Sequence, residues 1–394
     1  MKILACHNYY RSTSGEDLVF RQDLEILRQN AVDVREFKRE NSSVDALGAV
    51  RKAMLVPNAV YSRGSAREIR ETITSDKPDV AIVQNVLPLI SPSAYHILSK
   101  FRIPIVQLVY NYRLICPNAI LYTEGAICER CVKGNYVHAV VHKCYRGSRW
   151  ASALYATSLG LHRHLGKARE VITAYVTPDR FLKGKLIEGG YPGERIFPLL
   201  NPFDVSKYSP RFDSKGYLVY FGRIVREKGI FTLLSAVRGL PDVRLIVVGG
   251  GEAEAEARRR TAEYGLPNVE FVGPRYGDEL ISILRDAMAV VVPTEWYDNS
   301  PLVVHQAFSL GKPVIASRID GIPEIISDGV DGLLFEPGDV DDLAAKISVL
   351  CGNNALRDKL ARAARKKAET EFTSQRRFEG LMSVLQFAIG HPIT

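Results

Sequence analysis

The chain has 394 residues, of which 46% are hydrophobic and 24% are charged, a composition typical of globular proteins and not of disordered or fibrous ones. No stretch reaches 18 apolar residues, which excludes a transmembrane helix, and the N-terminus is typical of a first strand rather than of a signal peptide. We therefore expect a cytoplasmic protein of two domains.

The formal net charge of +8 is concentrated in the N-terminal half. Residues 1–200 carry 28 Lys and Arg against 18 Asp and Glu, whereas residues 201–394 carry 24 against 26. Within the first half, residues 102–185 hold 13 basic and 4 acidic residues. This imbalance indicates an anionic partner, namely a membrane surface, a phosphorylated substrate or a nucleic acid, although a solvated basic surface is the alternative. Zinc-finger, RNP and helix-turn-helix signatures are missing from the sequence, so no nucleic-acid partner is expected.

Apolar runs alternate with helical periodicities along the first half of the chain, which predicts a parallel, doubly wound sheet. The expected strands are Lys2–Cys6, Val32–Phe37, Asp79–Gln84, Ile105–Val109 and Val171–Ala174. The expected helices are Glu16–Asn30, Asn41–Ser75 with a break at Pro57, and Ser91–Phe101, and a loop is expected over His7–Gly15.

A linker at Asn201–Asp204 precedes a second set of alternating elements. The expected strands are Tyr217–Phe221, Arg244–Val248, Val269–Val272, Met288–Val292, Pro313–Ala316 and Gly332–Phe335. Helices are expected over 229–239, 252–264, 278–287, 300–310, 340–351, 354–371 and 374–389. The sequence thus predicts two Rossmann-like halves joined near residues 201–215.

The stretch Pro293–Gly311 follows a buried strand and begins a helix. Ser300 is expected to cap this helix, with Pro301 in its first turn. A helix N-terminus over the end of a parallel strand presents free N–H groups, which suits a phosphate. An ordinary strand-to-helix crossover is the alternative.

A second motif, Gly222–Gly229, carries Arg223 and Lys228 between a strand and a helix. Both cations are placed to neutralise a diphosphate above the sheet, unless they are surface cations beside Glu227. Gly249–Gly251 allows a tight turn and a close approach of backbone to a ligand, but it lacks the G-x-G-x-x-G pattern of dinucleotide sites.

Five motifs together carry a resemblance over nearly the whole chain: FGRIVREKG, VGGGE, FVGP, PTEWYDNSPLVVHQAFSLGKPVIAS and DGIPEIISDGVDGLLFEPGD. The sequence resembles the retaining GT-B fold glycosyltransferases of family 4. The resemblance implies two Rossmann-like doubly wound α/β domains that face each other across a cleft. Residues 1–200 would bind the acceptor, residues 201–373 would bind the nucleotide-sugar donor, and the C-terminal helix within 374–394 would pack back on the first domain.

The resemblance also implies roles for individual residues. Arg223 and Lys228 would hold the donor diphosphate beside Gly222, and Gly15 would contact it from the first domain. Asp298 and Gln306 stand at the two ends of the family's E-x₇-E signature, which contacts the donor sugar and the ribose. Tyr110 stands where the family often has a catalytic His. The remaining donor-binding positions are Arg275 and Tyr276 at the nucleobase, and Asn299, Ser300, Pro301, Leu302 and Val303 around the sugar and phosphate.

The implied reaction moves a sugar from a nucleotide-diphosphate donor to an acceptor with retention of configuration. The departing diphosphate accepts the acceptor's proton, so neither a protein nucleophile nor a catalytic metal is expected. The acceptor is expected to be a saccharide, lipid-linked or phosphorylated, and peripheral contact with an anionic membrane is also expected. Because Tyr110, Asp298 and Gln306 depart from the family pattern, a nucleotide-binding or scaffold protein with little turnover is the alternative. A nucleotide-sugar epimerase would need further acid/base groups, which the sequence lacks.

Four cysteines, Cys116, Cys128, Cys131 and Cys144, fall within a 29-residue segment. Cys-x₂-Cys with outlying partners is a structural zinc pattern, and His138 or His142 are alternative fourth ligands. The other interpretation is that these are ordinary buried thiols.

Overall fold

The computed structural model describes residues 1–11, 14–44, 58, 60–164 and 168–392. The chain forms two compact units. Unit 1 comprises residues 1–123, 128–202 and 374–394, and unit 2 comprises residues 124–127 and 203–373. The last helix of the chain therefore belongs to unit 1 rather than to the unit that directly precedes it.

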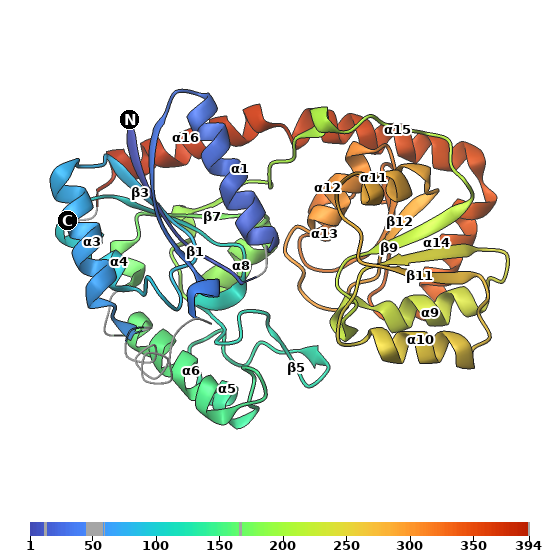
Figure 1. Cartoon of the computed structure of the whole chain (residues 1–394), viewed down its shortest axis with the longest axis horizontal. Coiled ribbons are helices and arrows are strands. Elements are labelled where there is room, and N and C mark those ends of the chain that lie inside the picture. The colour runs from blue at the N-terminus through green and yellow to red at the C-terminus, as the bar shows by residue number, and fades with distance from the viewer. Residues whose placement is uncertain (12–13, 45–57, 59, 165–167, 393–394) are drawn as a thin grey trace. The chain divides into compact units, whose positions relative to one another are not determined.

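Unit 1 is built on a six-stranded parallel sheet with the strand order β2-β1-β3-β4-β7-β8 (Figure 1). The strands are β1 (Lys2–Tyr9), β2 (Asp33–Glu40), β3 (Val80–Val83), β4 (Ile105–Leu108), β7 (Ala174–Thr177) and β8 (Ile196–Pro198). Strands β3, β4 and β7 are buried along their whole length, as expected for central strands covered by helices on both faces. A separate two-stranded ribbon consists of β5 (Tyr122–Thr123) and β6 (Ala126–Ile127).

The helices of unit 1 pack around this sheet. They are α1 (Gly15–Gln29), α3 (Arg63–Ser75), α4 (Ser93–Lys100), α5 (Val137–Val141), α6 (Arg149–His164), α7 (Ala168–Val171), α8 (Arg180–Glu188) and α16 (Ser374–Gly390). The 3₁₀ turns are η1 (Asn41–Val44), η2 (Tyr112–Leu114) and η3 (Gly193–Arg195). Helices α1 and α16, which lie at opposite ends of the sequence, pack against each other, and so do α5 and α6 (Figure 1).

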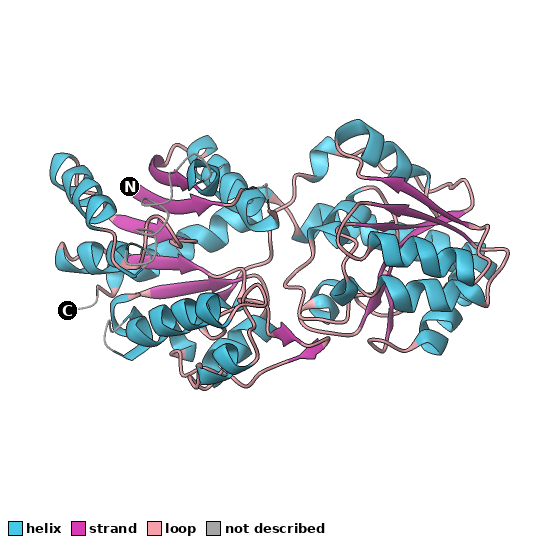
Figure 2. Cartoon of the chain, turned by 60° about the horizontal axis from the view of Figure 1, so that its bottom comes forward, coloured by secondary structure: helices cyan, strands magenta, loops and turns pink. Residues whose placement is uncertain are grey.

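Unit 2 repeats the architecture with the strand order β11-β10-β9-β12-β13-β14. Its strands are β9 (Tyr217–Phe221), β10 (Arg244–Val248), β11 (Val269–Gly273), β12 (Ala289–Val292), β13 (Val314–Ser317) and β14 (Gly332–Phe335). Its helices are α9 (Ile230–Arg238), α10 (Glu254–Glu263), α11 (Gly277–Asp286), α12 (Leu302–Ser309), α13 (Ile322–Ile325), α14 (Val340–Gly352) and α15 (Asn354–Glu371), with the 3₁₀ turns η4 (Val205–Lys207) and η5 (Arg226–Lys228). Figure 2 shows the strands of each unit enclosed by helices.

The first strand of each unit lies inside its sheet, with the strand order running outward in both directions from it. In unit 1 the order reverses between β1 and β3, and in unit 2 it reverses between β9 and β12. The crevice outside the carboxyl ends of the strands at such a point is where ligands bind in open α/β sheets. The loops that follow β3, β4, β9 and β12 are therefore the places to look for a site.

Some element boundaries differ from the sequence prediction. Strand β1 continues through His7 and Asn8 to Tyr9, because its partner β2 pairs with it along all eight residues. The loop predicted from His7 therefore begins later. The segment around Val171 is the end of α7, and the strand expected there begins at Ala174. Of the helical segment predicted over 41–75, the structure gives η1 and α3, and the part around Pro57 lies outside the described residues.

Candidate functional site

In unit 2, the loop after β9 packs directly on the loop after β12. Gly229 has a φ of +70°, and a Cβ atom there would lie 1.7 Å from the carbonyl oxygen of Pro293. The Glu295 N–H donates to the carbonyl of Glu227 across the same contact, at 2.9 Å. Only glycine fits such a position without moving one of the two loops. The contact holds the two predicted donor-binding motifs side by side.

The contact brings Lys228 and Asp298 together as an ion pair. Their side chains are 19% and 13% exposed, so the pair is only partly open to water. The Lys228 ammonium also lies 5.8 Å from the centre of the Trp296 ring. A cation held at the carboxyl end of a parallel sheet, with a carboxylate beside it, can transfer its interaction to an incoming anion.

Arg223 lies on the same loop as Lys228 but has different surroundings. Its side chain is exposed and forms no ion pair with the described residues, while its backbone carbonyl accepts a 2.6 Å hydrogen bond from Tyr220. Burial, and secondarily the charge of Asp298, raises the pKa of Tyr220, so this phenol stays neutral. Arg226, the third cation of the loop, is instead paired with Glu256 at 3.0 Å.

The glycines of the VGGGE motif have a structural reason that the sequence did not reveal. A Cβ atom on Gly249 would lie 1.9 Å from the carbonyl oxygen of Gly222, and one on Gly251 would lie 2.4 Å from that of Ile224. In the structure this close approach of backbone is to the neighbouring loop, and the predicted approach to a ligand stays a prediction. Gly222, with a φ of +142°, turns that loop away from β9.

Helix α12 follows the loop after β12 and has no side-chain cap. The predicted cap at Ser300 is wrong: Pro301 is the N-cap residue, and Ser300 precedes it with a φ of +42°. The first N–H groups of the helix, from Leu302 and Val303, therefore receive no side-chain oxygen from a cap. Gln306 follows one turn later and is half-buried.

The two residues predicted at the nucleobase follow β11, at the edge of the sheet of unit 2. Tyr276 is 79% exposed and occupies the N-cap position of α11 without a capping hydrogen bond. Arg275 donates to the carbonyl of Pro274 at 3.1 Å and lies 3.7 Å from Glu279. An exposed aromatic ring beside a cation offers a flat surface on which a base can stack.

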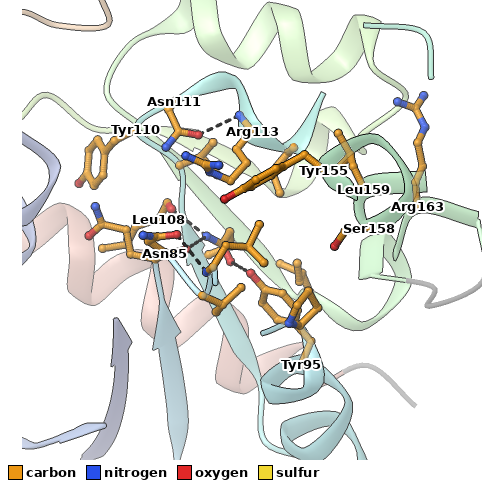
Figure 3. Close-up of a pocket in the computed structure, with 18 of the residues that line it drawn as sticks. Asn85, Tyr95, Leu108, Tyr110, Asn111, Arg113, Tyr155, Ser158, Leu159 and Arg163 are labelled. Carbon is orange, nitrogen blue, oxygen red and sulfur yellow. Dashed lines mark hydrogen bonds between the residues drawn. The ribbon is translucent and has the colours of Figure 1, made fainter. Parts of the chain in front are cut away.

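Unit 1 contains a cavity of about 900 Å³, including its open mouth, at the carboxyl ends of β3 and β4 (Figure 3). Its polar wall includes Gln84 and Asn85 after β3, and Asn111 and Arg113 after β4. Helix α6 supplies Tyr155, Ser158 and Leu159 from the opposite side (Figure 3). Apolar side chains such as Val86, Leu108 and Ile172 complete the lining. The cavity therefore combines hydrogen-bonding groups with an apolar floor, as small-molecule sites do.

Two polar atoms of this cavity have no partner among the described residues. Gln84 is 6% exposed; its amide nitrogen donates to the carbonyl of Glu16 at 3.2 Å, while its side-chain oxygen receives no hydrogen bond. The Nε of Arg113 is likewise buried and unbonded. Burial lowers the pKa of Arg113, but Tyr10, Tyr155 and Glu16 outweigh it and raise that pKa overall. A ligand with hydroxyl or anionic oxygen atoms would satisfy both atoms.

Tyr110, predicted as a catalytic group, lies in this wall but directs its hydroxyl into a buried network. The hydroxyl lies 3.3 Å from Asp23 of α1 and contacts Arg377 of α16. Arg377 and Asp23 form a bidentate ion pair, at 2.8 and 2.7 Å, with both side chains 1% exposed. Burial raises the pKa of Tyr110, so its phenol is neutral and suited to positioning rather than to accepting a proton.

Gly15 is the first residue of α1, directly after a capping box. Ser14 caps the helix, accepting from the Asp17 N–H at 3.2 Å while the Asp17 carboxylate accepts from the Ser14 N–H at 3.0 Å. Asp17 also bonds the buried ring of His7 at 2.8 Å, so this histidine is a satisfied core group. Burial alone would raise the pKa of Asp17, but His7 and Ser14 lower it overall.

The structure does not support the predicted zinc site. Cys116 and Cys131 are buried, Cys128 and Cys144 are half-buried, and all four are free thiols. In the part of the chain that the structure describes, no three His, Cys, Asp or Glu side chains are arranged to hold a metal ion. The thiol of Cys116 contacts Asn118 at 2.8 Å, and Cys131 packs with Tyr136 and Ala139. The ordinary-thiol interpretation therefore replaces the zinc prediction.

No helix within the described ranges is long and apolar enough to cross a membrane.

Sequence reasoning missed the cavity residues Gln84, Arg113 and Tyr155, and also the Asp23–Arg377 pair. One signal was available for Arg377. It occupies a position of α16 that continues the apolar stripe of Leu381, Val384 and Ala388, all buried. A charged residue inside such a stripe implies a buried partner, although the sequence does not say which.

Part of the chain is similar to known glycosyltransferases. The model described as "Glycosyl transferases group 1" matches residues 204–367. Sulfoquinovosyl transferase SQD2 of Arabidopsis thaliana is 34% identical over 211 residues, covering 49% of this chain and 41% of that protein. The capsular polysaccharide biosynthesis glycosyltransferase CapM of Staphylococcus aureus is 28% identical over 45% of this chain and 48% of its own length. The chain thus spans less than half the length of these two relatives.

Solved structures resemble the chain over nearly its whole length. Anabaena Alr3699/HepE, in complex with UDP, has a TM-score of 0.68 at 18% identity, covering 98% of this chain and all of that one. Sucrose-phosphate synthase from Thermosynechococcus elongatus has a TM-score of 0.69 at 17% identity, with 98% of each chain covered. At this identity the likeness concerns the fold, and it confirms the predicted GT-B fold. The chain therefore has the GT-B fold, and its residues 204–367 match the model of the glycosyl transferases group 1 family.

Proposed function

We propose that the protein is a retaining glycosyltransferase of family 4, which takes the sugar from a nucleotide-diphosphate donor. The observation that carries the proposal is the partly buried Lys228–Asp298 pair beside the uncapped N-terminus of α12. A diphosphate is the ligand that such a combination of cation and free N–H groups suits. The group 1 family match over the same residues supports the donor assignment.

In the proposed reaction, the bond between the anomeric carbon and the β-phosphate oxygen breaks while a bond to the acceptor hydroxyl oxygen forms. The hydroxyl proton passes to the departing phosphate on the same face, which retains the configuration. Negative charge grows on that phosphate, and Lys228, Arg223 and the N–H groups of α12 stabilise it. Because these groups supply the positive charge, the chemistry is proposed to need no metal.

The remaining predicted donor residues keep their proposed roles. Asp298 is assigned to the donor sugar, Gln306 to the ribose, and Arg275 and Tyr276 to the nucleobase. The backbone of Asn299–Val303 is assigned to the sugar and the phosphate, and Gly222 and Gly15 stay assigned to the diphosphate. UDP is the first nucleotide to test, because Alr3699/HepE is described in complex with UDP.

The acceptor is proposed to bind in the cavity of unit 1. Gln84 and Arg113 offer an unbonded acceptor and an unbonded donor there, and Tyr95 and Tyr155 offer aromatic surface against which a sugar ring can pack. We assign a saccharide to this cavity, lipid-linked or phosphorylated, as in polysaccharide biosynthesis. Tyr110 is proposed to position the wall of the cavity and not to exchange a proton. The predicted cytoplasmic location stays a prediction.

A second candidate is a nucleotide-binding protein of the same fold with little turnover. The replacement of Glu by Asp298, the neutral Gln306 and the occupied hydroxyl of Tyr110 favour it. It differs from the first candidate in one measurable respect: it would bind a nucleoside diphosphate without ever cleaving a nucleotide sugar.

The test is release of nucleoside diphosphate from a panel of nucleotide sugars, with the anomeric configuration of the product read by NMR. Lys228→Ala and Arg223→Ala are each expected to lower kcat by about 100-fold to 1000-fold, since each removes a charge from the developing anion. Arg226→Ala is the matched control, because this loop cation is engaged by Glu256. Equal rates in all three variants would refute the donor assignment. Binding of a donor without its cleavage would favour the second candidate. Because the reaction is proposed to need no metal, the wild type is expected to keep its full rate in EDTA.

A further inference from the structure

Helices α5 and α6 expose three large apolar side chains to solvent. Trp150 is 87% exposed, Val137 is 66% exposed and Val141 is 58% exposed. Val137 and Val141 are four residues apart and so share one face of α5, while Ala139 is buried in the cluster between α5 and α6. The exposed valines thus point away from the only helix that α5 packs on to a significant extent among the described residues.

The segment that contains α5 and most of α6 is strongly cationic. Residues 130–169 contain eight Lys and Arg and neither Asp nor Glu. Three of these cations, Lys143, Arg146 and Arg149, lie between Val141 and Trp150, and all three are exposed. Within the described residues none of the three forms an ion pair, whereas the cations of α10 are paired with Glu residues one turn away. The segment 143–149 therefore presents a positive charge that acidic side chains of the described residues do not neutralise.

The combination favours one kind of partner. An indole ring near cations is typical of residues that sit at the headgroup level of a bilayer, and aliphatic side chains enter the boundary below it. Lys and Arg next to such residues are attracted to anionic headgroups. A nucleic acid would use the cations and the indole, but it would leave both valines in water. The apolar residues thus select lipid over nucleic acid.

We propose that unit 1 docks on an anionic lipid surface through the α5–α6 face, which we define as Val137, Val141, Lys143, Arg146, Arg149 and Trp150. This surface lies outside the donor site and is independent of any reaction there. Helix α6 connects it to the cavity, because α6 carries Trp150 at its start and Tyr155, Ser158 and Leu159 in the cavity wall (Figures 1 and 3). Docking at this face would bring the cavity to the lipid surface where a lipid-linked acceptor resides.

The experiment is co-sedimentation of the full chain with vesicles of phosphatidylcholine alone or mixed with phosphatidylglycerol. We expect binding to the anionic vesicles that weakens with salt, and little binding to the neutral ones. The variant K143Q/R146Q/R149Q is expected to lose about 100-fold in affinity. The control K77Q/K100Q/R102Q removes the same charge from other exposed positions of unit 1 and is expected to bind like the wild type.

The apolar contribution is tested separately. The variant V137S/V141S/W150S is expected to bind at least about ten-fold more weakly than the control V330S/V349S/I389S, which removes three exposed aliphatic side chains elsewhere. A blue shift of tryptophan emission on vesicle binding is expected in the wild type and not in Trp150→Phe, since the other tryptophan, Trp296, is buried. Circular dichroism checks that each variant is folded.

Three results would overturn the proposal: equal binding to neutral and anionic vesicles, equal losses in the control variants, or no emission change on binding. Binding to an oligonucleotide without binding to vesicles would replace the lipid by a nucleic acid. Because no nucleotide sugar is added, a negative result leaves the proposed donor site untouched, and a failed donor assay leaves the docking result untouched.

Discussion

The buried ion pair between Asp23 and Arg377 should determine how firmly α16 is held in unit 1. Its two members are 354 positions apart in the sequence, and each side chain is 1% exposed. The Arg377 guanidinium also donates to the carbonyl of Leu199 at 2.9 Å and contacts the Tyr110 hydroxyl. Burial alone would lower the pKa of Arg377, but Asp23 and Tyr110 raise it overall, so the arginine is charged at any working pH.

Arg377→Met would leave the Asp23 carboxylate buried without its partner. Breaking a buried pair in this way costs about 3–5 kcal/mol of the free energy of unfolding. For a unit of this size each kcal/mol lowers Tm by about 2–4 °C, so we expect a drop of about 6–20 °C. Differential scanning calorimetry of the full chain measures this drop as the difference in Tm between the wild type and Arg377→Met.

The control is Arg259→Met, which removes an arginine from an exposed pair with Glu263 and is expected to cost at most about 1 kcal/mol. The double variant D23L/R377M is expected to recover part of the loss, because it leaves no buried charge behind. If Arg377→Met lowered Tm no more than Arg259→Met, the pair would not be the stabilising contact that its burial implies.

Three further predictions concern unit 2. Gly229→Ala should separate the two donor loops and abolish nucleotide binding in a calorimetric titration, whereas Gly216→Ala has the same type of φ but open space around it and should keep binding. Burial lowers the pKa of His305 to about 4. Below pH 6.5 the unfolded chain therefore binds a proton that the folded protein does not. The free energy of unfolding should fall by up to about 1.4 kcal/mol per pH unit as the pH drops from 6.5 to 4. Urea unfolding should show a shallower fall in His305→Asn, and an identical slope would contradict this reasoning. Asp298→Asn should bind nucleoside diphosphate as tightly as the wild type or more tightly, because Lys228 no longer pairs with a carboxylate. Weaker binding would contradict the idea that Lys228 leaves Asp298 to pair with the diphosphate.

The sequence was sufficient for most central strands of both sheets, because a central parallel strand is a continuous apolar run between turn residues. The edge strand β8 was not predicted, and β7 begins at Ala174 rather than at Val171. Runs such as Val80–Val83 and Ala289–Val292 form fully buried strands, and the predicted motif Pro293–Gly311 follows directly at the end of the second one. Predicting that Lys228 lies beside the loop after β12 was possible for the same reason, since the carboxyl ends of parallel strands share an edge.

The details that the sequence did not reveal depend on contacts between distant segments. Two glycines of the VGGGE motif, Gly249 and Gly251, face the backbone of the loop after β9, and no local pattern distinguishes that from contact with a ligand. The cap of α12 was misplaced by one residue, because Ser300 takes a left-handed conformation that a serine rarely adopts. The four cysteines matched a metal spacing, yet spacing alone does not fix whether three side chains are arranged to hold an ion, and no three are so arranged among the described residues.

The central claim is that Lys228 and the start of α12 form a diphosphate site. Isothermal titration calorimetry of UDP and UMP against the wild type and Lys228→Ala tests it most directly. We predict that UDP binds more tightly than UMP to the wild type, and that Lys228→Ala weakens UDP by at least about ten-fold while leaving UMP nearly unchanged. Equal affinities for the two nucleotides, or an unchanged UDP affinity in Lys228→Ala, would contradict it.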